Sequence, residues 1–259
     1  MKKSEKYVRI KSPEGVKFGR EKDNVIEILS APPWDEKSEV CGEINKTEAK
    51  LIAPCKPGKV VCLGINYKAH SDEFGHILPE DPLIFLKAPS SVIGPGEAIN
   101  YPPYWTKHVD YEAELAIVVG KKAKRVKREN ALEHIFGYTC LNDVTARDLQ
   151  RKDGQWTRGK SFDTFCPIGP AIVTKLDTSS LDIRSYVNGE LRQNSNTSFM
   201  IFDVQAIFEF VSHVMTLEPG DIIATGTPEG VGPLSPGDII EVEVEGIGRL
   251  KNYVVSCQQ

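Results

Sequence analysis

The chain has 259 residues, of which 40% are hydrophobic and 26% charged, and its formal net charge is −4. These values are typical of a globular protein with one large domain, or one domain and a small appendage. The negative charge does not favour nucleic acid as a partner, and no apolar run reaches the roughly 20 residues of a membrane-spanning helix. The charged amino terminus has no secretory pattern, so we expect a cytoplasmic protein whose six cysteines are reduced and bind no zinc.

Residues 1–56 are predicted to form a small β domain. Tyr7–Ile10 alternates along the chain and Val25–Leu29 is rich in β-branched residues, as strands are. Prolines and a glycine between residues 54 and 58 then interrupt any regular element. We therefore place a boundary near residue 56 and a second, larger domain over residues 57–259.

A polar loop follows the first predicted strand of this larger domain. Lys59–Leu63 is a short apolar run that predicts a buried strand, and the loop after it carries Tyr67, His70 and Glu73. Such loops carry functional residues more often than cores do. One helical turn would bring His70 within hydrogen-bond reach of Glu73. Taken alone, two such residues form a surface pair more often than a catalytic pair.

The stretch Asp110–Val119 carries an acidic pattern on a predicted strand. Its second half is apolar and β-branched, which predicts that the strand is buried. Glu112 and Glu114 are two residues apart, so both carboxylates face the same side of the strand. Two like charges repel and are costly to bury, and a divalent cation would offset that cost. The alternative is a pair of exposed glutamates on the polar face of a half-buried strand.

The run Lys121–Arg128 is basic at six of its eight positions. It contains no aromatic residue that could stack on a nucleic-acid base. A solvated loop and strand face is therefore the favoured interpretation, and a binding patch is a remote alternative.

Further polar residues gather where later elements begin or end. Gly137–Leu141 predicts a strand that leads to Asp143, where capping of a helix is the alternative to a functional role. Arg147 and Gln150 share one face of the helix that follows, and an arginine there suits a carboxylate ligand. Lys160 lies in a polar loop punctuated by glycine, where a lysine is usually solvated.

Three local patterns complete the chain. Asn188-Gly189 between strand-like runs predicts a β-hairpin, and an apolar stripe over residues 203–215 predicts the longest helix. The loop Thr225–Gly232 lacks the lysine of a phosphate-binding loop, but its N–H groups and the Thr227 hydroxyl suit an anion. Strands dominate and do not alternate with helices. We therefore expect a mainly β fold with short helices (α+β), built as a mixed β-roll or sandwich.

Together these residues resemble the fumarylacetoacetate hydrolase family, in order from about residue 59 to 253. The resemblance is to its shorter members, which are acylpyruvase-like or 2-hydroxyhepta-2,4-diene-1,7-dioate isomerase-like. Residues 1–56 resemble the small β domain of many prokaryotic members, and residues 57–259 correspond to the catalytic domain. The motifs that carry the resemblance are Asn66-Tyr67 with His70 and Glu73, Phe85-Leu86-Lys87, Glu112-Ala113-Glu114, Asn142–Arg147 with Gln150, Lys160-Ser161-Phe162, Val187–Glu190 and Thr225–Gly232.

The resemblance implies a homodimeric enzyme that binds Mg²⁺ or Mn²⁺ through Glu112, Glu114 and Asp143, with no nucleic-acid or membrane partner. Oxygen ligands suit these ions better than zinc. The implied substrate is a small 2-oxo acid that would chelate the ion through its carboxylate and keto oxygens.

The resemblance also implies roles for the other polar residues. His70, oriented by Glu73, would activate a water or move a substrate proton. Lys160 would stabilise an enolate, and a nearby cation would lower its pKa so that it could also transfer protons. The implied substrate-binding residues are Arg147, Gln150 and Thr227, with Tyr67 and Ser90 as further candidates for the same cleft.

The predicted reaction is hydrolysis of a C–C bond in an acylpyruvate or fumarylpyruvate-type 2-oxo acid. Isomerisation of 2-hydroxyhepta-2,4-diene-1,7-dioate, and decarboxylation or tautomerisation of oxaloacetate, are alternatives on the same site, because fold does not decide the reaction. A non-catalytic protein that binds through Lys121–Arg128 is a remote alternative. Long eukaryotic members carry another acidic metal ligand where this chain has Val60–Gly64, so the shorter members are the better guide.

Overall fold

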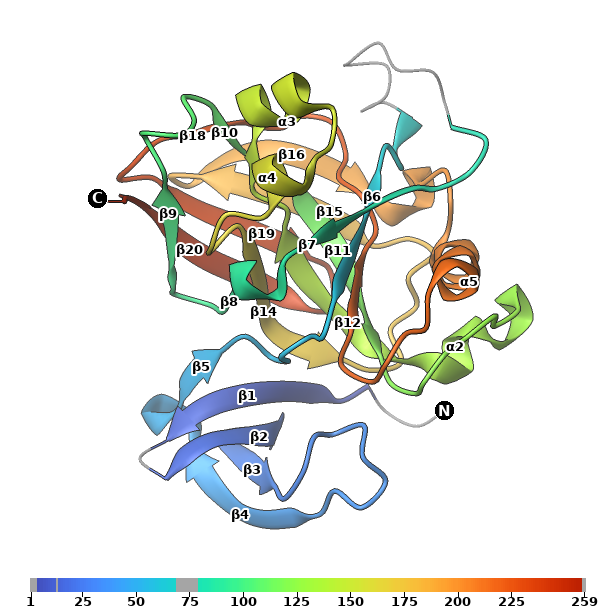
Figure 1. The fold of residues 1–259 in the computed structure, drawn as a ribbon. Helices are drawn as coiled ribbons and strands as arrows, with labels where there is room; N and C mark the ends of the chain where they lie inside the picture. The colour runs from blue at the N-terminus through green and yellow to red at the C-terminus, as the bar shows by residue number, and fades with distance from the viewer. Residues whose placement is uncertain (1–3, 13, 69–78, 258–259) are drawn as a thin grey trace.

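The computed structural model of the chain describes residues 4–12, 14–68 and 79–257. In these residues strands dominate and helices are short, so the predicted fold class is confirmed. A small lobe formed by the amino-terminal strands lies below a larger body in Figure 1. Within the described part of the chain, no helix is long and apolar enough to cross a membrane. His70 and Glu73 lie outside the described residues, and their roles remain predictions.

The largest sheet has twelve strands and runs through both the lobe and the body. These are β1 (Lys6–Ser12), β2 (Gly15–Glu21), β3 (Val25–Leu29), β4 (Val40–Asn45), β5 (Lys50–Ile52), β6 (Val60–Gly64), β7 (Leu83–Lys87), β8 (Val92–Ile93), β11 (Ala113–Val119), β12 (Ile135–Asn142), β14 (Cys166–Val173) and β17 (Ile222–Ala224). Their order is β4-β3-β2-β1-β14-β12-β11-β17-β6-β7, with β5 attached to β1 and β8 to β14. Pairing is mostly antiparallel, but β6 and β17 are parallel, so the predicted mixed character is confirmed.

Two smaller sheets complete the body. One has the order β16-β15-β19-β20-β9, and the other β13-β10-β18. Their bounds are β9 (Ala98–Tyr101), β10 (Val109–Tyr111), β13 (Thr145–Ala146), β15 (Asp182–Val187), β16 (Glu190–Asn196), β18 (Gly232–Leu234), β19 (Ile239–Val244) and β20 (Gly248–Ser256). The predicted hairpin joins β15 to β16. Its turn residues Asn188 and Gly189 have φ values of 54° and 83°, which the two-residue turn requires and which asparagine and glycine adopt most readily.

The described helices are short. They are the 3₁₀ turns η1 (Lys46–Glu48), η2 (Pro89–Ser91), η3 (Arg128–Asn130) and η4 (Thr197–Phe199), and the α-helices α2 (Ala131–His134), α3 (Arg147–Asp153), α4 (Thr157–Lys160) and α5 (Val204–Val214). As predicted, α5 is the longest of these. Asp203 caps it by accepting a hydrogen bond from the N–H of Ala206 at 2.9 Å. Its apolar stripe is buried against the core of the body.

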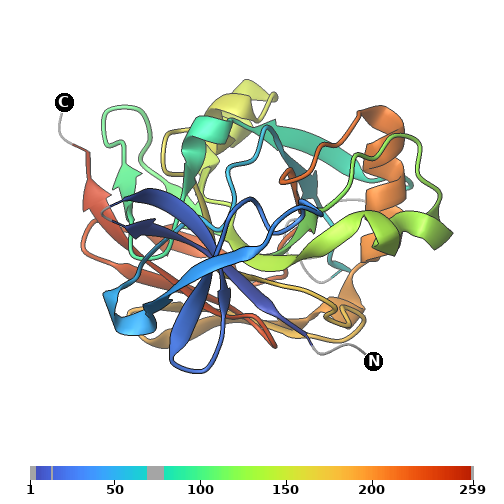
Figure 2. The same ribbon diagram turned by 90° about the horizontal axis from the view of Figure 1, so that it is seen from below.

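The amino-terminal lobe is hydrogen-bonded to the body. β1 pairs with β14, with Lys6 opposite Val173. In the view from below, the strands of the lobe lie in front of the body (Figure 2). The ring of Phe136 also contacts Tyr7 and Trp34, at centroid distances of 5.2 and 5.6 Å. The boundary predicted near residue 56 falls between β5 and β6, and it remains a prediction.

β11 is the strand that positions the site. All seven of its residues are buried, because it lies between β12 and β17 within the largest sheet. Its amino-terminal end lies beside the carboxyl-terminal end of the antiparallel β12, with Ala113 opposite Asn142. Polar residues just outside these two ends are therefore brought together from positions about thirty residues apart in the sequence.

Candidate active site

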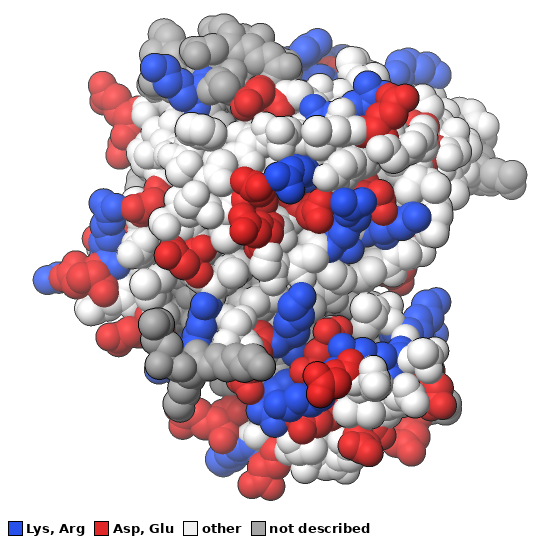
Figure 3. Space-filling model, turned by 180° about the vertical axis from the view of Figure 1, so that it is seen from behind, with Lys and Arg blue, Asp and Glu red and all other residues white. Residues whose placement is uncertain are grey.

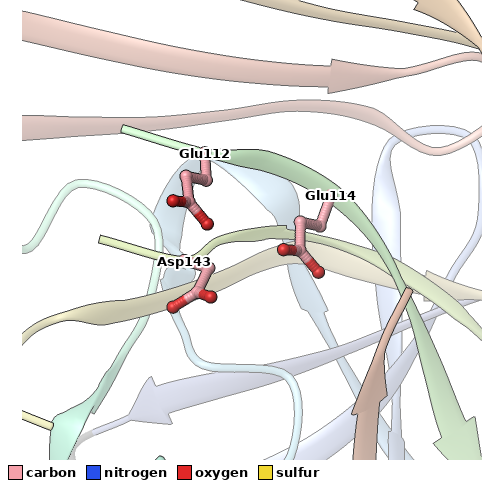
Figure 4. A group of neighbouring side chains, drawn as sticks. All are labelled: Glu112, Glu114 and Asp143. Carbon is pink, nitrogen blue, oxygen red and sulfur yellow. The ribbon is translucent and has the colours of Figure 1, made fainter. Parts of the chain in front are cut away.

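Three carboxylates meet where β11 begins and β12 ends. One oxygen each from Glu112, Glu114 and Asp143 lies within 4.8 Å of the others. All three residues are at most 5% exposed. Figure 4 shows the two glutamate side chains with that of Asp143 beside them. The alternative of exposed glutamates on a polar strand face is therefore wrong.

The backbone around these carboxylates differs from the prediction in two places. The single strand predicted over Asp110–Val119 is divided at Glu112, between β10 and β11. The N–H of Glu112 donates to the side-chain oxygen of Asn142 at 3.0 Å, which holds it outside the regular ladder. Asp143 caps no helix. Its N–H donates to the carbonyl of Glu112 at 2.9 Å, and α3 begins four residues later at Arg147.

Lys160 is buried between two of the carboxylates. Its Nζ lies 2.8 Å from Glu112 Oε2 and 2.7 Å from Asp143 Oδ2. It also lies 5.0 Å from the ring centroid of Phe85, a cation–π contact. Burial alone would lower the pKa of Lys160, but the charges of Asp143 and Glu112 raise it above its ordinary value. Lys160 is therefore not the usual solvated lysine, and the lower pKa that a nearby cation would cause remains a prediction.

Arg147 binds a second pair of acidic groups. Its Nε donates to Asp110 Oδ2 at 2.8 Å, and its two terminal nitrogens donate to Glu112 Oε1 at 2.5 Å and to Gln150 Oε1 at 2.7 Å. Burial would lower the pKa of Arg147, and Glu112 and Asp110 more than reverse that effect. The guanidinium predicted to bind a substrate carboxylate therefore already binds two carboxylates of the protein.

Two residues of this cluster were given no role from the sequence. Lys87 at the end of β7 is fully buried, and its Nζ binds Asp143 and the carbonyl of Val144, the latter at 3.1 Å. A lysine that ends an apolar strand gives no sign that it turns inward. Asp110 did carry a signal, because it precedes Glu112 and Glu114 at the same two-residue spacing.

Glu114 has one oxygen without a hydrogen-bond partner in the part of the chain that the structure describes. Its Oε2 accepts the N–H of Gly226 at 2.8 Å, so the loop predicted to bind an anion binds a carboxylate of the protein. This oxygen, Oε1, is buried, and none of the described residues donates a hydrogen bond to it. Burial, followed by the charges of Asp143 and Glu112, raises the pKa of Glu114 well above its ordinary value. An unpaired carboxylate oxygen of this kind fits a cation ligand.

The formal charges of the cluster agree with that fit. Among the described residues, four carboxylates face three Lys and Arg side chains, which gives one excess formal negative charge in a buried place when all four carboxylates are ionised. The carboxylates are those of Asp110, Glu112, Glu114 and Asp143, and the basic groups are those of Lys87, Arg147 and Lys160. A bound divalent cation would change the net charge of the cluster from about −1 to about +1, so the magnitude of the buried charge would not increase.

The raised pKa of Glu114 predicts how the metal-free protein responds to pH. In the folded state Glu114 keeps its proton at pH values where the unfolded chain, with an ordinary pKa of 4.5, has lost it. The folded state then binds more protons, so this group lowers stability as pH rises above about 4.5. We expect Glu114→Gln to lose less stability between pH 5 and pH 7 than the wild type. Urea unfolding at the two pH values in EDTA measures the free energy of unfolding, and an identical loss in both proteins would contradict the raised pKa of Glu114.

A cavity of about 400 Å³ opens above Glu112 and Lys160. Its polar lining includes Arg147, Gln150 and Thr227, three of the predicted substrate-binding residues. Its apolar lining is formed by Leu63, Ile65, Phe85 and Trp156. Gly64 also lines it, and a Cβ on this residue would lie 2.7 Å from the Trp156 ring. Glycine at this position is therefore what lets the indole form one wall of the cavity.

The other predicted contacts have different surroundings. Thr227 donates its hydroxyl to the carbonyl of Ala113 and accepts from Gln193, at 2.9 and 2.8 Å. Tyr67 is fully buried, and its hydroxyl has no hydrogen-bond partner among the described residues; burial and the charge of Glu114 raise its pKa. Ser90 is exposed in η2 and is not among the residues that line the cavity.

The basic run Lys121–Arg128 lies along α5. Ala123 and Val126 are buried, while the six basic residues are exposed. Lys122 pairs with Glu218 at 2.9 Å, and Arg128 pairs with Asp203. On the face seen from behind, basic and acidic side chains lie interspersed (Figure 3). These contacts agree with a solvated face, the interpretation favoured from the sequence.

A buried acidic cluster beneath an open cavity is the kind of site in which enzymes of mainly β fold bind small molecules. The profile described as Fumarylacetoacetate (FAA) hydrolase C-terminal matches residues 59–255. The chain belongs to this family, as its motifs predicted.

Three relatives illustrate the range of the family. An uncharacterized protein of Methanocaldococcus jannaschii is 59% identical, over 88% of this chain and 98% of its own length. The mitochondrial oxaloacetate tautomerase of Xenopus laevis is 45% identical, over 82% and 70%. The crystal structure of 5-carboxymethyl-2-hydroxymuconate delta-isomerase from Mycobacterium smegmatis is 46% identical and superposes with a TM-score of 0.91, over 97% of this chain and 100% of that one.

Proposed function

We propose that the protein is a Mg²⁺- or Mn²⁺-dependent enzyme that converts a small 2-oxo acid through its enol, and that keto–enol isomerisation is its reaction. The observation that carries this proposal is the contact of Lys160 with Glu112 and Asp143 at the floor of the cavity, beside the unpaired oxygen of Glu114. Such a site can bind a keto acid and stabilise negative charge on its oxygen.

Glu112, Glu114 and Asp143 would hold the cation. When bound, the cation supplies a Lewis acid that polarises the carboxylate and keto oxygens of the substrate. The residues fit this role because the three carboxylates are close together, are buried and retain an unpaired oxygen. They are also the hard oxygen ligands that Mg²⁺ and Mn²⁺ prefer.

The side chains of the cavity would stabilise the developing charge, orient the substrate and transfer the proton. The ammonium of Lys160, which contacts Glu112 and Asp143, would stabilise the oxygen on which charge develops as a proton leaves the neighbouring carbon. Arg147 holds Glu112 in place from the opposite side. The side-chain amide of Gln150 and the hydroxyl of Thr227 line the cavity and would orient the substrate. We assign the proton transfer itself to His70, oriented by Glu73, as the resemblance implies.

We favour isomerisation over C–C hydrolysis because it requires fewer catalytic functions from these residues. It needs a proton removed, an enolate stabilised and a proton returned, whereas C–C hydrolysis also needs a positioned water. The printed names of two relatives, an oxaloacetate tautomerase and a delta-isomerase, support this order. Hydrolysis of an acylpyruvate remains the second candidate, because the matched family is named for a hydrolase.

The test follows enol oxaloacetate as it converts to the keto form, with Mg²⁺ and then with EDTA. We expect a rate proportional to enzyme concentration that falls to the uncatalysed rate after chelation. Proton NMR of the products separates the candidates, since pyruvate and a second acid from an acylpyruvate indicate hydrolysis and release of CO₂ indicates decarboxylation. Equal rates with and without EDTA would exclude the proposed metal role. The proposed homodimer is checked separately by light scattering.

A further inference from the structure

One basic residue of the cavity has no acidic partner among the described residues. Three basic side chains line the cavity, those of Arg147, Arg151 and Lys160. Two of them bind buried carboxylates of the protein. In the described chain no ion pair involves Arg151, which is exposed at the mouth of the cavity. Among the described residues, Arg151 is therefore the arginine whose guanidinium is available to a carboxylate that enters the cavity.

Arg151 is held beside the cavity by its helix. It follows Arg147 by four residues on α3, so the two side chains lie on one face, one turn apart. Gly159 of α4 packs so closely on α3 that a Cβ there would lie 2.9 Å from the backbone nitrogen of Gln150. Asp153, the acidic residue nearest in sequence on its carboxyl-terminal side, pairs instead with Arg158.

We propose that Arg151 binds a second carboxylate at the far end of the substrate, and so selects 2-oxo dicarboxylates over 2-oxo monocarboxylates. This inference rests on the proposed function of the same site. The keto acid end would lie at Lys160 and the acidic cluster, and the apolar side chains of Phe85 and Trp156 would contact the carbon chain between the two ends. A guanidinium binds a carboxylate through two parallel hydrogen bonds, which gives selectivity as well as affinity.

The experiment compares two 2-oxo acids of four carbons, oxaloacetate and 2-oxobutyrate, which differ in the second carboxylate. Calorimetric titration with Mg²⁺ present gives the Kd of each, and proton NMR in D₂O gives the rate of deuterium exchange at C3. The proteins are the wild type, Arg151→Gln and Arg151→Lys. The matched control is Lys152→Gln, which removes the same charge from the next residue of α3, an exposed one that does not line the cavity.

We expect Arg151→Gln to weaken oxaloacetate binding about 10-fold, as loss of a charged hydrogen-bonded pair does, and to change 2-oxobutyrate binding less than twofold. Arg151→Lys should lie between, since it keeps the charge and loses the paired geometry. Lys152→Gln should match the wild type with both acids. Equal losses for both acids, or equal losses in the two glutamine variants, would overturn the inference. Selective oxaloacetate binding without deuterium exchange would instead refute the proposed function and leave the role of Arg151 standing.

Discussion

Glu114→Gln is expected to abolish Mg²⁺ binding and to lower kcat/KM by about 10³-fold or more, while the metal-free protein keeps its fold and gains stability. The amide oxygen of glutamine can still accept the N–H of Gly226, which Glu114 Oε2 accepts at 2.8 Å. The substitution also removes one of the carboxylates that repel one another at the end of β11. The loss of function is therefore expected without a loss of packing.

Thermal unfolding with and without Mg²⁺ measures the loss of metal binding separately from any change in the stability of the metal-free protein. Mg²⁺ at 100 times its Kd should stabilise the wild type by about 2.7 kcal/mol and leave Glu114→Gln unchanged. The matched control is Glu190→Gln on β16, an exposed glutamate that pairs only with Arg192 among the described residues. It should respond to Mg²⁺ like the wild type. An unchanged Mg²⁺ affinity in Glu114→Gln would show that Glu114 is not a ligand.

Lys160→Met is expected to have the second largest effect, on both stability and turnover. The ammonium neutralises Glu112 and Asp143 in a buried place, and breaking such a pair costs about 3–5 kcal/mol. Methionine has a similar length and keeps the contact with Phe85, so the loss is one of charge rather than of volume. At saturating Mg²⁺ we expect kcat to fall by about 10²–10³-fold, because the ammonium proposed to stabilise the developing oxyanion is then lost.

Urea unfolding in EDTA and steady-state kinetics in Mg²⁺ check the two parts of this prediction separately. Lys152→Met provides the control, since Lys152 is exposed on α3 and makes no ion pair in the described residues. A lower stability with an unchanged kcat would assign Lys160 a structural role only. Unchanged stability would contradict the energetic importance of its two ion pairs.

Local patterns sufficed for several elements of this fold. The Asn188-Gly189 hairpin and the helix α5 were predicted because a turn with positive φ and an apolar stripe depend on neighbouring residues only. The two-residue spacing of Glu112 and Glu114 likewise placed both carboxylates on one side of the chain. It could not show that the chain leaves the ladder at Glu112, because that break depends on Asn142, thirty residues away.

A mainly β chain, with its acidic and basic motifs in a family-specific order, could be predicted from the sequence alone, because strand period, turn residues and motif order can be read along the chain. Which charged side chains pair with one another became known from the three-dimensional arrangement of the strands. In that arrangement Lys87 points inward and binds Asp143, and Arg147 binds Asp110 and Glu112. Arg151 lies at the mouth of the cavity. The physical reason is that the energy of an ion pair depends on distance and burial, and the antiparallel pairing of β11 with β12 sets both across gaps that no local pattern spans.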